Sequence, residues 1–278
     1  VLGWFISHEL RSDHPSLDIR LFRVPRFAAP VALVGLVFFA AMGVMFFNAF
    51  YLQLVRGYSP LETGLLFLPF AAAQLVFAPR SAAMVRRFGG RAVAVVGLVL
   101  TAVALGGFVF VDEVTPIWVV LVLTFLQGTG MANIMPPATE SIMSALPREK
   151  AGVGSAVSNT VRQVAGALGV AVLGSVLSAV YREDIASALA GLPGPARDAA
   201  DESISGAYAA AAQLGPAAPK LIAAANDSFV AAMHWAAGLS ALVAALGILI
   251  ALRWMPGRPA TGPTEARPVV EPELAGTV

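Results

Sequence analysis

The chain has 278 residues, of which 58% are hydrophobic and only 13% are charged, and its mean hydropathy is +0.77. Soluble domains carry about 25% charged residues, so this composition argues against a soluble protein with one membrane anchor. The net charge of +1, with no dense basic patch, predicts no nucleic-acid partner. The absence of cysteine excludes thiolate metal sites, and the three histidines are too scattered for a metal cluster, so we predict no metal and no cofactor.

Six long apolar runs fill most of the chain and predict six membrane-spanning helices. A bilayer core of about 30 Å requires about 20 mostly apolar residues in a helix, and each run is long enough. The runs are continuous rather than alternating, which favours helices over membrane strands. The predicted fold class is therefore an all-α polytopic membrane protein. The expected spans are residues 28–54, 62–84, 92–112, 116–143, 152–181 and 228–252.

The remaining segments complete the predicted organisation. The chain opens within an apolar phrase and without an initiator Met, so we expect a C-terminal fragment that begins at the end of a preceding helix. The long Ala-rich segment before the last span is expected to form an extracytoplasmic loop with short amphipathic helices, and the Pro-rich tail to be disordered. The predicted segments are residues 1–8 for the helix end, 9–27 for a cytoplasmic loop, 28–181 for spans one to five, 182–227 for the outer loop, 228–252 for the last span and 253–278 for the cytoplasmic tail.

Basic residues predict the orientation of the spans. Cytoplasmic loops of membrane proteins are enriched in Lys and Arg. Twelve basic residues lie in the segment before the first span, the second-to-third loop, the fourth-to-fifth loop and the tail, against four on the opposite side. Both ends of the six-span unit, including the C-terminus, are therefore expected in the cytoplasm, as an even number of spans requires.

The fifth span combines small residues with a polar face. A four-residue repeat over residues 154–178 is made of Gly and Ser except at Arg162 and Val170, and a second ridge of small residues follows residues 167–179. Small residues let membrane helices approach closely, but packing alone does not explain Asn159, Arg162 and Gln163 on one face. We predict that these three side chains contact substrate, water or the backbone of a second bundle. The alternative is a role in packing and hydrogen bonding.

Glu140 is the carboxylate that lies well inside a predicted span. Because an ionisable group inside a membrane is costly, its presence suggests a function. Counting residues along the helices places Glu140 and Arg162 in the cytoplasmic half of the membrane. We predict that they form a charge pair near a cytoplasmic gate. The alternative is that Glu140 extends to the membrane interface.

Four polar residues interrupt the other apolar runs: Asn48 and Gln74 in the first and second spans, and Gln127 and Asn133 in the fourth. We expect them to line a substrate cavity or gate, near Met and Phe side chains that suit varied apolar ligands. Ordinary packing is the alternative for each. The tandem proline at 136–137 predicts a kink, and broken helices near the midplane indicate transporter binding sites.

Three segments resemble the C-terminal half of the fourteen-span drug:proton antiporters, the EmrB/QacA-like branch of the major facilitator superfamily. Residues 51–65 read YLQLVRGYSPLETGL and are similar to the first-to-second span junction of that half. Residues 151–163 read AGVGSAVSNTVRQ and resemble the penultimate span, and residues 17–22 read LDIRLF and resemble the cytoplasmic entrance. The similarity covers about residues 17–181 in the family's order.

The resemblance implies a six-helix C-terminal bundle that rocks against the missing N-terminal bundle of the same transporter. It implies small amphipathic organic substrates, protons as the coupling ion, a coupling acid in the N-terminal half, and a multi-pass location in the lipid bilayer of the bacterial inner membrane. It further implies that the first and fourth spans line the cavity. The second and fifth spans would face the other bundle, and the third and sixth would lie outside.

The second-to-third loop resembles the cytoplasmic gating loop of the same superfamily. Arg87, Gly89 and Arg91 fit a tight, basic turn. The family pattern usually has Gly and Asp where Ala82 and Arg86 stand here, so we do not expect a charge relay at this loop.

The sequence therefore predicts the C-terminal half of a proton-coupled multidrug efflux transporter that works by alternating access. One alternative is a dedicated exporter of a single metabolite or self-made antibiotic. Another is a non-transport membrane protein, either a scaffold or a lipid-modifying enzyme. The chain has no phosphate-binding Gly loop, no metal-spaced His set and no nucleophile motif, so an enzyme is not predicted.

Overall fold

The computed structural model describes residues 22–147, 150–255 and 257. Within these residues the regular structure is entirely helical, and six helices are long and apolar enough to cross a membrane, which confirms the predicted all-α fold. The predictions made for residues 1–8, for most of the loop 9–27 and for most of the tail 253–278 lie outside the described residues. The candidate spans are Pro25–Val55, Pro60–Phe88, Gly90–Phe110, Ile117–Ser144, Ala151–Leu189 and Gly215–Trp254.

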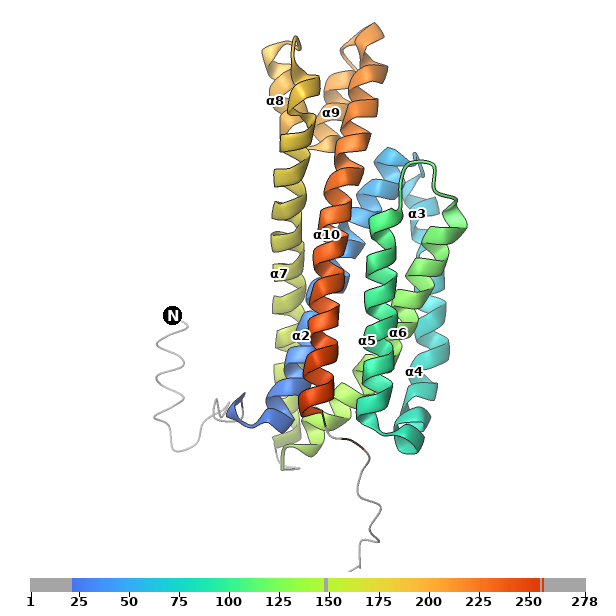
Figure 1. The fold of residues 1–278 in the computed structure, drawn as a ribbon, viewed down its shortest axis with the longest axis vertical. Coiled ribbons are helices and arrows are strands. Elements are labelled where there is room, and N and C mark those ends of the chain that lie inside the picture. The colour runs from blue at the N-terminus through green and yellow to red at the C-terminus, as the bar shows by residue number, and fades with distance from the viewer. Residues whose placement is uncertain (1–21, 148–149, 256, 258–278) are drawn as a thin grey trace, which may run out of the picture.

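The candidate spans contain or join several helical segments (Figure 1). The described elements are α2 (Pro25–Phe50), η2 (Tyr51–Val55), α3 (Pro60–Leu66), α4 (Leu68–Phe88), α5 (Gly90–Gly107), η3 (Phe108–Phe110), α6 (Ile117–Ser144), α7 (Ala151–Ile185), η5 (Ala186–Leu189), α8 (Gly194–Glu202), α9 (Ile204–Ala211), η6 (Gly215–Ala217) and α10 (Ala218–Trp254). Helix α6 runs unbroken through the tandem proline at 136–137.

Local sequence signals set the two ends of the second span. Ser59 and Glu62 form a capping box in front of α3, with Pro60 at the first helical position, so the free N–H groups of the helix start are satisfied. At the other end, Gly89 separates α4 from α5 with φ +87°, a conformation that side-chain-bearing residues rarely adopt. The second and third spans therefore meet in a one-residue turn.

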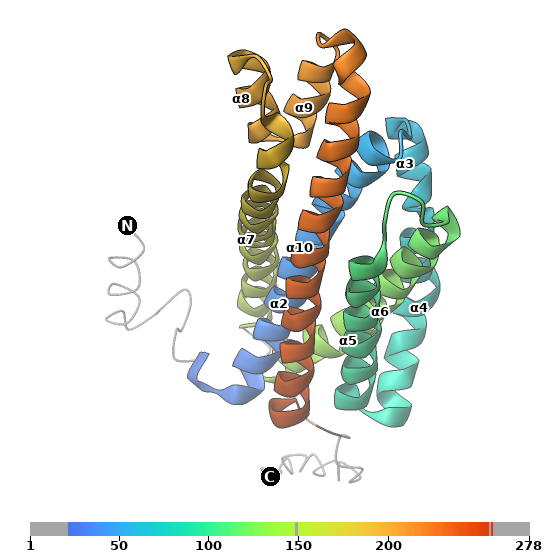
Figure 2. The ribbon, with the colours of Figure 1, turned by 45° about the horizontal axis from the view of Figure 1, so that its top comes forward.

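The six spans pack as two similar units of three helices (Figures 1 and 2). Helix α2 packs against α7 and α10, and α6 packs in the corresponding way against α4 and α5. Contacts between α2 and α6 and between α5 and α10 join the units. Successive spans alternate in direction, so α6 runs opposite to α2, α4 opposite to α7 and α5 opposite to α10, which is the pattern of inverted repeats in transporters.

Helices, rather than an irregular loop, make up most of residues 182–227. Helix α7 has 35 residues and α10 has 37, which corresponds to about 50–55 Å each and exceeds the membrane core. Figure 1 shows them extending past α5 and α6, with α8 and α9 beside them. Packing stabilises the extension: buried Ile185, Ile204 and Phe229 share one core. A count of apolar residues predicts only the membrane-crossing part of a helix, and these two helices continue beyond the expected spans at residues 152–181 and 228–252.

The charges divide between the two ends of the bundle. The end where α2 begins and α10 stops is called the Gly89 end, and the opposite end is called the α8–α9 end. Apart from Glu140, every described acidic residue lies at the α8–α9 end. The described basic residues of the Gly89 end are Arg23, Arg26, Arg80, Arg86, Arg87, Arg91, Lys150 and Arg253.

Candidate functional site

Helices α2 and α7 approach each other closely, and a polar groove lies beside this contact. A methyl group added to Gly169 of α7 would overlap the carbonyl oxygen of Phe39 on α2. One added to Gly43 of α2 would overlap Leu173 and lie 3.1 Å from the Gly169 carbonyl oxygen. The small residues of the fifth span therefore act as predicted at this seam, since they bring the two backbones together.

A polar groove of about 460 Å³ follows this seam. It contains Asn159, Arg162 and Gln163 of α7, and Phe38 and Met42 of α2. Helical spacing of three and four residues places the polar groups on one face, as the sequence predicts, and the close approach of α2 supplies the apolar wall. The groove is open on the side that no other described helix covers.

Arg162 is the charged group of this groove. Its Nη2 donates to Asn159 Oδ1 at 3.2 Å, and its guanidinium carbon lies 5.8 Å from the centre of the Phe38 ring, within cation–π range. Its Nε is buried and has no hydrogen-bond partner among the described residues. A desolvated guanidinium that is only partly satisfied is costly inside a membrane, so the site favours a further acceptor.

The predicted charge pair between Glu140 and Arg162 is not formed. Glu140 is exposed on α6, whereas the contacts of Arg162 are with Asn159 and Phe38. Helices α6 and α7 meet only marginally. Residue counting gives the depth of a side chain along its helix but not the direction it faces, which is why the pair was wrongly expected.

The other polar candidates do not line the Arg162 groove. Asn48, Gln127 and Asn133 are buried, and Gln74 is half-buried on α4. Asn133 Nδ2 donates to the Thr129 carbonyl oxygen at 2.8 Å, beside the α5 seam. The Oδ1 atoms of Asn48 and Asn133 are buried without a partner among the described groups. Their role in a cavity stays a prediction.

The turn at Gly89 is tied to the end of the last helix. Arg91 Nε donates to the Met255 carbonyl oxygen at 2.7 Å, and this satisfies a backbone group just after α10. Arg87 instead lies over the neighbouring Phe88 ring, at 5.2 Å from its centre. The two residues of the contact are 164 positions apart, so no local signal in the sequence could have revealed it.

A second hydrogen-bonded network closes the α8–α9 end. The Tyr51 hydroxyl donates to the Asp112 carbonyl oxygen at 2.6 Å, and Arg56 Nη1 donates to the Tyr51 hydroxyl at 3.1 Å and to the Thr115 carbonyl oxygen at 2.5 Å. The Tyr208 hydroxyl of α9 donates to the Leu54 carbonyl oxygen at 2.6 Å. These contacts join α2, the α5–α6 loop and α9.

Two neighbouring carboxyl groups in the α5–α6 loop have opposite pKa shifts. The Thr115 hydroxyl donates to Asp112 Oδ1 at 2.6 Å and lowers the pKa of Asp112. Burial raises the pKa of Glu113, and the charges of Asp227 and Asp112 add to the effect. Glu113 Oε1 is buried without a hydrogen-bond partner among the described residues.

Comparison with known proteins places the site in a family context. Residues 7–170 match the Major Facilitator Superfamily. The chain is 38% identical over 175 residues to the multidrug resistance protein Stp of Mycobacterium tuberculosis, covering 63% of this chain and 32% of that protein. It is 36% identical over 256 residues to the tetracenomycin C resistance and export protein of Streptomyces glaucescens, covering 87% of this chain and 47% of that protein.

A third relative, the multidrug efflux pump LfrA of Mycolicibacterium smegmatis, is 34% identical over 255 residues, covering 90% of this chain and 50% of that protein. The matched regions of these three relatives amount to a third to a half of their lengths. The similarity therefore concerns one part of a longer transport protein in each case.

Proposed function

The chain belongs to the Major Facilitator Superfamily, and on that basis we propose that it is the C-terminal six-helix bundle of a fourteen-span multidrug efflux transporter. The protein is a multi-pass membrane protein of a transporter family, so the prediction that it is not an enzyme is confirmed. The transporter would export small amphipathic compounds across the bacterial plasma membrane in exchange for protons.

The observation that carries this proposal is the open groove that contains Arg162, whose buried Nε has no hydrogen-bond partner among the described residues. In the spans that contain α4 and α7, only 11% and 22% of the most apolar stretch is buried. In the spans that contain α2 and α6, the buried share is 56%. Helix α7 also exposes the small ridge at residues 167–179, a surface suited to close helix packing. Both features favour a second bundle against this face, with a substrate cavity between the bundles.

Arg162 would then engage the N-terminal bundle rather than hold a cationic substrate. Its unsatisfied Nε and the absence of a carboxylate partner among the described residues favour an acceptor from outside the chain. A carboxylate there would pair with Arg162 when ionised and release it when protonated. Asn159 and Gln163, which are neutral, would contact the substrate. Proton binding to the missing acid would thus change how the two bundles meet.

The charge distribution supports an orientation for this cycle. The basic Gly89 end would face the cytoplasm, and the acidic α8–α9 end would face outside. The Arg162 groove would therefore be open to the cytoplasm in one state and to the α8–α9 end in the other.

Substitution of Arg162 in the full-length transporter tests the proposal. We expect Arg162→Ala to lower proton-driven ethidium efflux about tenfold or more, because a pairing charge is lost, and Arg162→Lys to restore part of it. Arg80→Ala is the matched control, since Arg80 is exposed and donates to the Val76 carbonyl oxygen of its own helix. Normal efflux by a correctly inserted Arg162→Ala protein would overturn the assigned role.

A dedicated exporter is the second candidate. The relative from Streptomyces glaucescens is named for resistance to and export of one compound, and its match covers 87% of this chain. Efflux measured for a panel of unrelated dyes and drugs separates the two candidates. Transport of one structural class alone would favour the dedicated exporter.

A further inference from the structure

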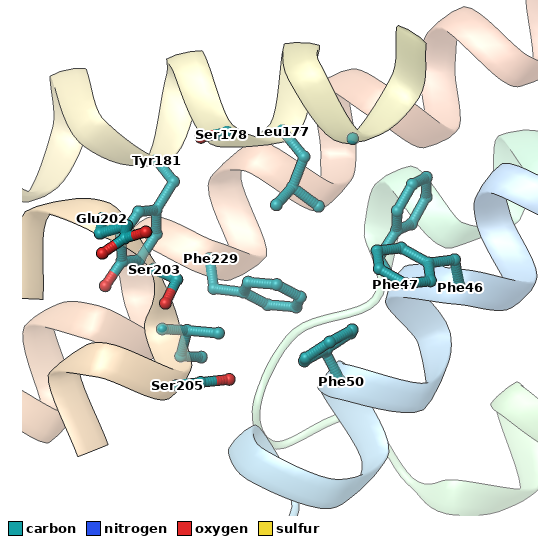
Figure 3. Close-up of a pocket in the computed structure, with 12 residues that line it drawn as sticks. Phe46, Phe47, Phe50, Leu177, Ser178, Tyr181, Glu202, Ser203, Ser205 and Phe229 are labelled. Carbon is teal, nitrogen blue, oxygen red and sulfur yellow. The ribbon is translucent and has the colours of Figure 1, made fainter. Parts of the chain in front are cut away.

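A second cavity of about 220 Å³ lies at the α8–α9 end and is lined by aromatic rings (Figure 3). Phe46 and Phe50 come from α2, Tyr181 from α7 and Phe229 from α10, and Glu202 stands at the junction of α8 and α9. No local pattern in the sequence indicates this cavity, because its walls come from four segments that the fold brings together.

The aromatic walls are held in place by the rest of the core. Tyr181 is 1% exposed and Phe229 is 2% exposed. The Tyr181 hydroxyl donates to the Ala200 carbonyl oxygen at 3.1 Å, which fixes its ring against α8. The Phe46 and Phe50 rings meet edge to face, with their centres 5.1 Å apart. Phe46 is exposed and Phe50 is half-buried, so a ligand would meet mainly these two rings, with Tyr181 and Phe229 packed behind them.

The charge of the cavity is negative. Glu202 is exposed and supplies the charged side chain among the lining residues. Acidic residues outnumber basic ones over residues 182–227, so the surroundings also attract cations. Arg182 lines the adjoining groove rather than the cavity. Aromatic faces and a carboxylate together favour a ligand that is both aromatic and positively charged.

The cavity and the Arg162 groove are linked through shared lining residues. An intermediate groove of about 480 Å³ shares Val170 with the Arg162 groove, and it shares Phe46, Gly174 and Ser178 with the aromatic cavity. The three spaces follow the α2–α7 seam from the middle of the bundle to its α8–α9 end. A compound that moves along this face would therefore reach the aromatic cavity last.

We propose that this cavity binds the aromatic part of amphipathic organic cations, with Glu202 as the counter-charge. The inference deepens the proposed function, and rests on it for the direction of travel, because the cavity would be the last site before release. Binding itself does not depend on transport. The cavity is small, so it would hold one or two fused rings while the rest of the ligand lies in the adjoining groove.

A single reporter thiol measures occupancy at this site. The chain has no cysteine, so Ser205→Cys introduces one at an exposed position in the cavity wall. In the full-length protein, freed of any cysteines elsewhere and held in lipid nanodiscs, we expect ethidium to slow maleimide labelling of this thiol. Ala209→Cys, exposed on α9 outside the cavity, is the control and should not be protected.

Two further variants and one control test whether the carboxylate and the space of the cavity bind the ligand. Glu202→Gln should raise the ethidium concentration that gives half protection by about threefold, because an exposed charge contributes modestly. Glu183→Gln, an exposed acid outside the cavity, should leave it unchanged. Gly174→Leu should weaken protection about tenfold or more. A methyl group at Gly174 meets nothing within 4 Å, so the larger side chain would occupy the cavity rather than distort the helices.

Three results would overturn the proposal: no protection of the Ser205→Cys thiol by ethidium, equal effects of Glu202→Gln and Glu183→Gln, or equal protection by the anion 8-anilinonaphthalene-1-sulfonate. The last result would indicate a lipid or a general apolar ligand. Protection that survives Arg162→Ala while efflux is lost would leave both proposals standing. Normal efflux in Arg162→Ala with intact protection would reject only the assigned transport site.

Discussion

The α2–α7 and α6–α4 pairs occupy corresponding places in the two three-helix units, but in the described residues different side chains line the space beside each pair. In each pair a glycine approaches a carbonyl oxygen of the opposite helix: Gly169 approaches Phe39, and Gly128 approaches Phe70. Along α2–α7 the adjoining space holds Arg162. Along α6–α4 the Phe77 and Phe125 rings meet edge to face at 6.1 Å.

This difference separates packing from chemistry. Close helix contact requires a small residue at the crossing point, and both units meet that requirement. Nothing in the packing requires a charge, so the close packing that the two units share does not account for Arg162. The repeat therefore sets where helices meet, and the sequence of one unit places the polar groups there.

The largest expected effect comes from adding a methyl group at either crossing point. Gly169→Ala and Gly128→Ala should each lower the free energy of unfolding by about 1–3 kcal/mol, because the new methyl overlaps a backbone oxygen. Gly174→Ala is the control, since its methyl would contact nothing. Thermal unfolding in detergent checks all three. If one crossing tolerates alanine and the other does not, the packing equivalence of the two pairs fails.

A smaller effect should distinguish polar residues of the two pairs. Asn159→Ala removes the exposed hydrogen bond to Arg162 and should lower efflux about fivefold, which corresponds to about 1 kcal/mol, the usual net contribution of a hydrogen bond. Gln74→Ala, on α4 of the other pair, should lower efflux less, because no described charged group depends on it. Ethidium efflux per inserted protein is the measurement. Equal losses would mean that both seams take part in transport.

The contact that joins the two units at the Gly89 end can be broken separately. Arg91→Ala should lower the free energy of unfolding by about 1 kcal/mol, because the Met255 carbonyl loses its donor. Arg87→Ala is the matched control, since Arg87 contacts only the neighbouring ring in the described part of the chain. Protease sensitivity of the end of α10 provides a local readout. An unchanged digestion pattern in Arg91→Ala would show that this contact does not hold the helix.

The smallest effect concerns Glu113, in the α5–α6 loop of the second unit. Its pKa is raised, so folding favours its protonated form, and the cost of its charge increases as pH rises from its ordinary pKa through the raised value. Glu113→Gln should therefore stabilise the protein at pH 7 by about 0.5 kcal/mol or less, and not at about pH 4. Unfolding temperatures measured across this range test the sign. A larger benefit at low pH would contradict the assignment.

The sequence by itself determined the helical class, the number of described spans and the polar face of α7. Each of these depends on residues close together in the chain: apolar runs of membrane length, and the spacing of Asn159, Arg162 and Gln163. The sequence also indicated the basic turn at Gly89. Its failures, such as the Glu140–Arg162 pair, involve residues on different helices.

Tertiary structure alone decided which faces meet. The Arg91–Met255 contact spans 164 residues, and the aromatic cavity combines rings from α2, α7 and α10 with the carboxylate at the end of α8. Helical periodicity fixes where a side chain lies on its own helix, but the rotation of one helix against another depends on the summed packing of the whole bundle. Arg162 could thus be identified from the sequence, while Phe38 beside it and the path toward Glu202 became visible only in the fold.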